Sequence, residues 1–280
     1  MLRFIIMMLV TLLLLPSASS VLAKGEWNDS LQRDISRWMR TISAQDAQFA
    51  PWRGATISVR TLGAGQHQWL VTVTKQGEEV GYMVVAELPE ADASIRMPVF
   101  ALLEYGSGEY LLFDDKLAPQ NVTAVPIYNG FASYWKVTNG RVTQYIDAKT
   151  GERYPTSFQA DPEKIGLTNP RDLVTAEKNL TRLRSFSVLE EDPFDSIDWL
   201  PAALAEPADK EAVSWRGLLE RQERRSAVLS VSLFHDQVMA PFSIGSVHVW
   251  NEEAAYVGVW NEGLRFLPFA YANQVGRIVN

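Results

Sequence analysis

The side chains of this chain that could perform acid–base chemistry include three histidines, and His248 is the strongest candidate among them. It lies in a segment that alternates like a β-strand and that a turn follows. Such a histidine can act as a general base when a second group fixes its tautomer, but it needs a nucleophile to activate. The nearby serines, Ser243 and Ser246, lack the paired glycines of a nucleophile elbow. The sequence leaves two alternatives, a catalytic base and a packed strand residue, and favours the second.

A second group of reactive side chains lies within a short segment: Asp147, Lys149, Thr150 and Glu152. An aspartate can accept hydrogen bonds from the backbone of a turn that follows it, and Gly151 can adopt the positive φ that closes such a turn. Asn139-Gly140, just upstream, is typical of a type I′ turn in which both residues have positive φ. These residues therefore predict two chain reversals rather than an active site.

The chain contains no cysteine, which excludes thiol catalysis, thiolate zinc sites and iron–sulfur clusters. The three histidines show neither His-x-x-x-His nor His-x-His spacing, and the acidic pairs do not form an EF-hand loop. We therefore predict no metal and no cofactor. The net charge of −7 also disfavours nucleic acid and anionic membrane surfaces as partners, because both require clustered Lys and Arg.

The first residues predict a signal peptide over residues 1–23. Arg3 supplies a positive charge, Phe4–Leu15 is apolar, and Val21-Leu22-Ala23 suits signal peptidase, which predicts cleavage between Ala23 and Lys24. The alternative is an uncleaved anchor, but the apolar stretch would span only about 18 Å as a helix, less than a bilayer needs. We expect a secreted or cell-surface protein without stable membrane insertion.

The pattern of apolar residues that follows predicts an α+β fold: an N-terminal helix and an antiparallel meander, then a smaller α+β C-terminal domain. Helices are expected at 27–49, 170–184 and 209–225. Strands are expected at 55–62, 68–75, 80–88, 97–104, 109–113, 133–138, 141–147, 227–234, 244–250, 254–260 and 263–267. The predicted domains are residues 24–155 and 193–280, joined by a linker at 156–192 that contains the short helix.

Within the first predicted domain, Tyr145-Ile146-Asp147-Ala148-Lys149-Thr150-Gly151-Glu152 resembles the closing hairpin of PepSY-type domains. Gly81–Ala86 and Pro98–Gly108 are similar to strands in the pro-region of streptopain-type cysteine peptidases. The resemblance covers residues 65–155. It implies a domain that inhibits a peptidase or assists its folding.

The C-terminal segment resembles the second half of bacteriocin-processing-type, papain-like peptidases, in which a histidine starts a strand and an Asp or Asn follows a hairpin later. His248 and Asn261 stand at those two positions. The family's nucleophile is a cysteine, which this chain lacks. The resemblance therefore implies a degenerate, non-catalytic relative.

Taken together, the sequence predicts an exported, non-catalytic module that binds a protein partner, either a peptidase or an envelope component, as an inhibitor, chaperone or scaffold. Strands 68–75 and 98–104 are predicted sheet edges at which a partner could add a strand. One alternative is a secreted hydrolase that uses His248 with a nucleophile other than cysteine. A second alternative is a structural protein of the envelope or spore coat.

Overall fold

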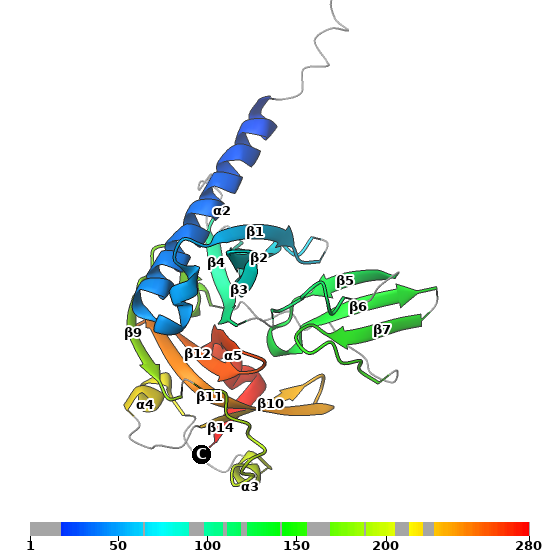
Figure 1. Ribbon diagram of the computed structural model, residues 1–280, viewed down its shortest axis with the longest axis vertical. Coiled ribbons are helices and arrows are strands. Elements are labelled where there is room, and N and C mark those ends of the chain that lie inside the picture. Colours follow the sequence, from blue (N-terminus) through cyan, green and yellow to red (C-terminus); the bar gives the residue numbers. More distant parts are fainter. Residues whose placement is uncertain are drawn as a thin grey trace, which may run out of the picture.

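The computed structural model describes residues 18–63, 65–89, 98–108, 111–118, 122–140, 142–155, 169–187, 189–204, 213–220 and 227–279. Within these residues the fold is α+β: a long N-terminal helix, a large antiparallel sheet, a small three-stranded sheet and a few short helices (Figure 1). The predicted fold class is confirmed at this level. A division into two domains is not shown in the described part of the chain.

The N-terminal helix α2 (Ala18–Gln45) and the short 3-10 helix η2 (Ala47–Trp52) follow each other closely. They form where the sequence predicts one helix over 27–49, because an apolar stripe recurs at helical spacing and is fully buried. Asp46 separates the two helices, and its Oδ1 caps η2 by accepting the Gln48 N–H at 2.9 Å.

Most of the predicted signal peptide lies outside the described residues, which begin at Ala18. Helix α2 passes through the predicted cleavage point between Ala23 and Lys24. None of the helices among the described residues is long and apolar enough to cross a membrane.

The large sheet combines strands from both ends of the chain. From the first part come β1 (Thr56–Thr61), β2 (Gln68–Lys75), β3 (Glu78–Glu87) and β4 (Phe100–Ser107). From the last part come β10 (Val228–Leu233), β11 (Val238–Trp250), β12 (Ala254–Trp260), β13 (Leu264–Pro268) and β14 (Gly276–Val279). The strand order is β1-β2-β3-β4-β13-β12-β11-β10-β14, so the two meanders meet where β4 pairs with β13.

The small sheet contains β5 (Thr123–Ile127), β6 (Tyr134–Asn139) and β7 (Val142–Asp147), in that order, with the 3-10 helix η3 (Gly130–Ala132) between β5 and β6. Figure 1 shows it on the opposite side of the molecule from α2. The predicted type I′ turn at Asn139-Gly140 is wrong. Asn139 is the last residue of β6, pairs with Val142 and lacks a positive φ, so only Gly140 of this pair, at φ 61°, has a positive φ.

The predicted helix at 170–184 is also wrong. The segment forms the 3-10 helix η4 (Pro170–Asp172), then β8 (Val174–Thr175), which pairs with β4, and β9 (Leu180–Ser185), which pairs with β11. Its leucines have helical spacing, but the open side of β11 supplies ladder hydrogen bonds that a short isolated helix cannot match.

Residues 111–113, predicted as part of a strand, instead form a turn, while 109 and 110 lie outside the described residues. The remaining helices are α3 (Leu200–Leu204), α4 (Trp215–Glu220) and α5 (Phe269–Val275). Helix α4 confirms the helix predicted at 209–225 over residues 215–220, whereas residues 213 and 214 are not helical. Helix α5 and strands β5 and β14 were not predicted.

The two faces of the large sheet bury two separate apolar clusters. On one face α2 and η2 cover aromatic residues of the strands that include Tyr105, Tyr256 and Phe266. On the other face residues of the small sheet and of α5 pack on β2, β3 and β10. Side chains alternate between the faces except where the register shifts, and on β4 the neighbours Glu104 and Tyr105 lie on opposite faces.

Candidate functional site

His248 lies in the centre of the first cluster, and its side chain is completely buried. Its Nε2 is 3.0 Å from Oδ2 of Asp46, and its Nδ1 is 2.7 Å from the hydroxyl of Tyr105. A carboxylate can only accept, so Nε2–H donates to Asp46 while Nδ1 accepts the Tyr105 proton. Burial lowers the pKa of His248, and the Asp46 carboxylate opposes that shift. The ring is therefore a neutral link between η2, β4 and β11.

This geometry lends no support to catalysis by His248. Both ring nitrogens have partners, and the ring packs on Phe266 at a centroid distance of 4.1 Å. The hydroxyl of Ser246 donates to the Arg184 carbonyl at 3.0 Å instead of to the histidine. A general base must reach a proton of a substrate or a nucleophile, and the only hydroxyl bonded to this ring among the described residues is that of Tyr105, which is itself buried.

The structure does not bring Asn261, the second predicted site residue, to His248. Asn261 follows β12, and its Oδ1 accepts a hydrogen bond from Arg265 Nη1 at 2.7 Å. Arg265 points to the sheet face opposite His248, where it is 2% exposed. Asn261 thus belongs to a different polar group.

That second group is a buried ion pair between Glu104 on β4 and Arg265 on β13. Nε and Nη2 of Arg265 lie 3.0 and 3.2 Å from the two carboxylate oxygens, a bidentate contact. The hydroxyl of Tyr82 donates to Oε1 and that of Tyr128 donates to Oε2 at 3.1 Å. Burial alone would lower the pKa of Arg265, but the Glu104 carboxylate raises it above its ordinary value. Each oxygen of the Glu104 carboxylate thus accepts two hydrogen bonds, and the side chain is fully buried, so the pair is closed to ligands.

Lys149 lies beside this ion pair, 3% exposed, with its Nζ 5.6 Å from the centre of the Tyr82 ring. Burial and then the positive charge of Arg265 lower the pKa of Lys149 to about 7, against the attraction of Glu104.

Lys149 lies in the turn that the sequence predicts after β7. Oδ1 of Asp147 accepts the N–H groups of Lys149 and Thr150 at 2.7 and 2.8 Å, and Gly151 has a φ of 74°. The predicted conformational roles of Asp147 and Gly151 are confirmed.

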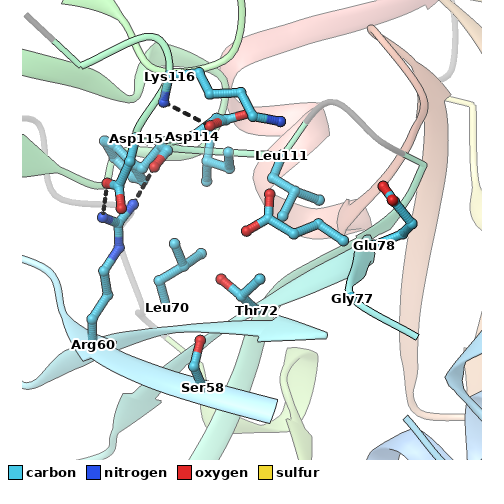
Figure 2. A pocket seen from close by; sticks show the side chains of 13 residues that line it. Ser58, Arg60, Leu70, Thr72, Gly77, Glu78, Leu111, Asp114, Asp115 and Lys116 are labelled. Atoms are coloured by element: carbon cyan, nitrogen blue, oxygen red, sulfur yellow. Dashed lines mark hydrogen bonds and ion pairs between the residues drawn. The ribbon is translucent and has the colours of Figure 1, made fainter. Parts of the chain in front are cut away.

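A candidate site that is open to solvent is a cavity of about 430 Å³ beside β1. Its lining comes from β1 and β2, from the turn between β2 and β3, and from the loop that leads toward β5 (Figure 2). The lining residues are Ser58, Arg60, Leu70, Thr72, Gly77, Glu78, Glu79, Leu111, Leu112, Phe113, Asp114, Asp115 and Lys116. Its floor is apolar, since it consists of the buried Leu70 and residues 111–113. Its rim is charged.

Local sequence explains both walls of this cavity. Gln76 and Gly77 both have positive φ, 54° and 90°, which gives the tight two-residue turn that presents Glu78 at the rim. In the opposite wall, Oδ1 of Asp114 accepts the Lys116 N–H at 2.8 Å and fixes the loop as an Asx turn.

Arg60 joins the two walls of the cavity. Its guanidinium pairs with the Asp115 carboxylate and donates to the carbonyl of Phe113, as Figure 2 shows for the loop above β1. Phe113 has a φ of 59°, which is unusual for a bulky residue, and its N–H donates to the Ala148 carbonyl at 2.8 Å. The Arg60 side chain therefore attaches the loop at residues 113–115 to β1. Within the described part of the chain, no group of three or more His, Asp and Glu side chains is placed to hold a metal ion.

The outer side of β1 is an open sheet edge. Strand β1 pairs only with β2 among the described strands. The two strands predicted as edges, 68–75 and 98–104, are wrong in that role: β2 lies between β1 and β3, and β4 lies between β3 and β13. Sequence spacing shows which segments are strands, but edge position depends on pairings between distant segments.

Sequence reasoning did not single out Asp46, Tyr105, Glu104, Arg265 or Arg60. Two of them could have been found from the sequence, since Glu104 and Arg265 are charged residues inside apolar strands, where an unpaired charge would be costly.

Comparison with protein-family models, with curated proteins and with solved structures found no match for this chain.

Proposed function

We propose that this chain is an exported, non-catalytic module that binds a protein partner by adding a strand of that partner to β1. The observation that carries the proposal is the open edge of β1. The partner would be a peptidase or an envelope component, and the module would act as its inhibitor, chaperone or scaffold.

The register of β1 and β2 determines which backbone groups face outward. The Leu62 N–H donates to the Gln68 carbonyl at 2.9 Å, so these residues form a hydrogen-bonded pair. Hydrogen-bonded and non-bonded pairs alternate in an antiparallel ladder, and the register continues without a bulge. Ile57, Val59 and Thr61 therefore direct their N–H and C=O groups away from β2. These are the groups to which an extended peptide binds in strand addition.

The location of the polar chemistry also favours binding over catalysis. His248 and the Glu104–Arg265 pair are buried and have partners on every side. The open edge and its cavity, in contrast, offer hydrogen-bonding groups and charges to a macromolecule. No observation favours the hydrolase or the structural coat protein in the same way.

The resemblance of residues 65–155 to PepSY-type domains and peptidase pro-regions agrees with this proposal, as does the predicted signal peptide with cleavage between Ala23 and Lys24. In the same proposal, residues 24–155 form the propeptide-like part and residues 193–280 a degenerate papain-like part. The absence of cysteine fits a relative that has lost catalysis.

The test compares Val59→Pro with Val59→Thr. Proline removes an outward N–H without removing a β1–β2 hydrogen bond, whereas threonine has a similar shape and keeps the N–H. Secreted and envelope fractions of the source cells are captured on each immobilised variant and quantified by mass spectrometry. We expect at least one protein to be retained by the wild type and by Val59→Thr but depleted at least tenfold on Val59→Pro. Equal recovery on all three variants would refute capture at β1.

A further inference from the structure

We infer that the strand captured by β1 carries a lysine or arginine whose side chain enters the cavity beside Arg60. This inference rests on the proposed function and goes further, because it specifies the chemistry of the partner. It follows from the position of the cavity relative to the open edge and from the charges on its rim.

The cavity lies under one face of the open edge. Ser58 and Arg60 of β1 line it, whereas Ile57 and Val59 point to the opposite face and pack against the apolar cluster that α2 and η2 cover. A strand added to β1 continues the same alternation, so every second side chain stands next to Ser58 or Arg60. One of these side chains is thus directed over the cavity, whose lining includes Leu70, Thr72 and Leu111 (Figure 2).

The lining suits a long side chain with a cationic end. The apolar floor of Leu70 and Leu111 can cover a methylene stem, while the charged head stays at the rim, as lysine and arginine commonly do. The rim and walls hold four carboxylates, those of Glu78, Glu79, Asp114 and Asp115, against two cations.

The charges available to a ligand are more one-sided than this count suggests. Arg60 and Asp115 are paired with each other, which removes both from the balance. Glu78 and Glu79 have no ion-pair partner among the residues that the structure describes. With Asp114 they leave three carboxylates against Lys116 alone. An acidic side chain would meet repulsion, and an apolar one would leave these charges without a partner.

The rim is exposed to solvent, so its charges determine selectivity more than affinity. Exposed ion pairs contribute roughly 0.2–1 kcal/mol each, which for two glutamates corresponds to about a twofold to thirtyfold change in Kd. Most of the affinity would come from the backbone hydrogen bonds along β1. The preference for a cation should weaken as salt is raised.

The experiment pans a phage-displayed library of random heptapeptides against the chain purified from cells that express the full-length sequence. The enriched peptide is synthesised in two forms, one with its basic residue and one with norleucine there, which keeps a linear aliphatic chain and lacks the charge. Their Kd values are measured by fluorescence anisotropy for four proteins: the wild type, Glu78→Gln/Glu79→Gln, Val59→Pro and Val59→Thr.

We expect enriched peptides to contain Lys or Arg, to bind the wild type and Val59→Thr alike, and to lose at least tenfold on Val59→Pro. Norleucine should weaken binding threefold or more to the wild type but by less than twofold to the double glutamine variant. Peptides that are sensitive to Val59→Pro but bind equally well with norleucine overturn the cationic preference and leave strand capture intact. A library that yields no peptide sensitive to Val59→Pro overturns strand capture itself, and the inference with it.

Discussion

His248 and Asp46 are 202 positions apart in the chain, yet Nε2 of the histidine lies 3.0 Å from Oδ2 of the aspartate. The contact ties the end of the N-terminal helix to β11 through two side chains that are both almost inaccessible to solvent. Asp46 also caps η2 with its other oxygen. One carboxylate therefore satisfies a partly buried donor on η2 and a buried donor on β11, which lie far apart in the sequence.

The first prediction concerns this carboxylate. Asp46→Ala should lower the free energy of unfolding by about 2–4 kcal/mol, because it removes a helix cap and leaves a buried imidazole N–H without an acceptor. Urea unfolding followed by tryptophan fluorescence measures the change. The exposed Asp29 on α2 provides the control, and Asp29→Ala should change stability by less than about 0.5 kcal/mol. A loss below about 1 kcal/mol for Asp46→Ala would contradict the structural role assigned to the pair.

The second prediction concerns the buried Glu104–Arg265 pair. Glu104→Gln should cost about 3–5 kcal/mol, because Arg265 would remain charged and buried without its counter-ion. Arg265→Met should cost a similar amount. The double variant should be less destabilised than the sum of the two by at least about 1 kcal/mol, since neither charge remains. Additive losses in the urea denaturation of all three variants would show that the two side chains do not act as a pair.

The sequence predicted elements whose signal is local. The apolar stripe of α2, the alternation of β2 and β11, and the turn at Asp147–Gly151 each depend on residues close together, and each is present, although α2 and β11 begin earlier than predicted. Position in the sheet could not be predicted in this way. The pairing of β9 with β11 overrides the helical spacing of its leucines, and the pairing of β1 with β2 makes β1 the edge.

The same distinction applies to the candidate site. His248 could be found from its residue type, but its partners Asp46 and Tyr105 come from distant segments that show no chemical pattern in the sequence. The cavity beside β1 combines four separate segments. Its acidic rim is a property of the folded chain, since Glu78 and Asp114 look like ordinary turn residues when each is viewed alone.

The third prediction concerns the turn after β7. Asp147→Ala removes the acceptor for the Lys149 and Thr150 N–H groups and for the Tyr154 hydroxyl, which donates to Oδ2 at 2.7 Å. We expect a loss of about 1–3 kcal/mol in thermal or urea unfolding. Asp147→Asn keeps an oxygen for the backbone donors and should lose less than half as much. Equal losses for the two substitutions would show that the backbone acceptor is unimportant.

The last prediction is a pH dependence caused by Lys149. In the folded chain burial and Arg265 lower its pKa to about 7 from the ordinary 10.5, so between these values the unfolded chain binds a proton that the folded chain lacks. Stability contributed by this group therefore rises as pH increases from about 7 to about 10, and the full cost of burying the charge is present below about pH 7. Removing the amine should relieve that cost.

Lys149→Met should accordingly change stability most favourably at pH 6–7, and its advantage over the wild type should shrink by about 2–5 kcal/mol by pH 10. Urea unfolding of both proteins across this range isolates the contribution of Lys149, because all other titrating groups are common to the pair. Lys136→Met, at an exposed position on β6, controls for the loss of one positive charge. If the difference between Lys149→Met and the wild type were constant from pH 6 to pH 10, the lysine would titrate alike in the folded and unfolded chains, and the assigned environment would be wrong.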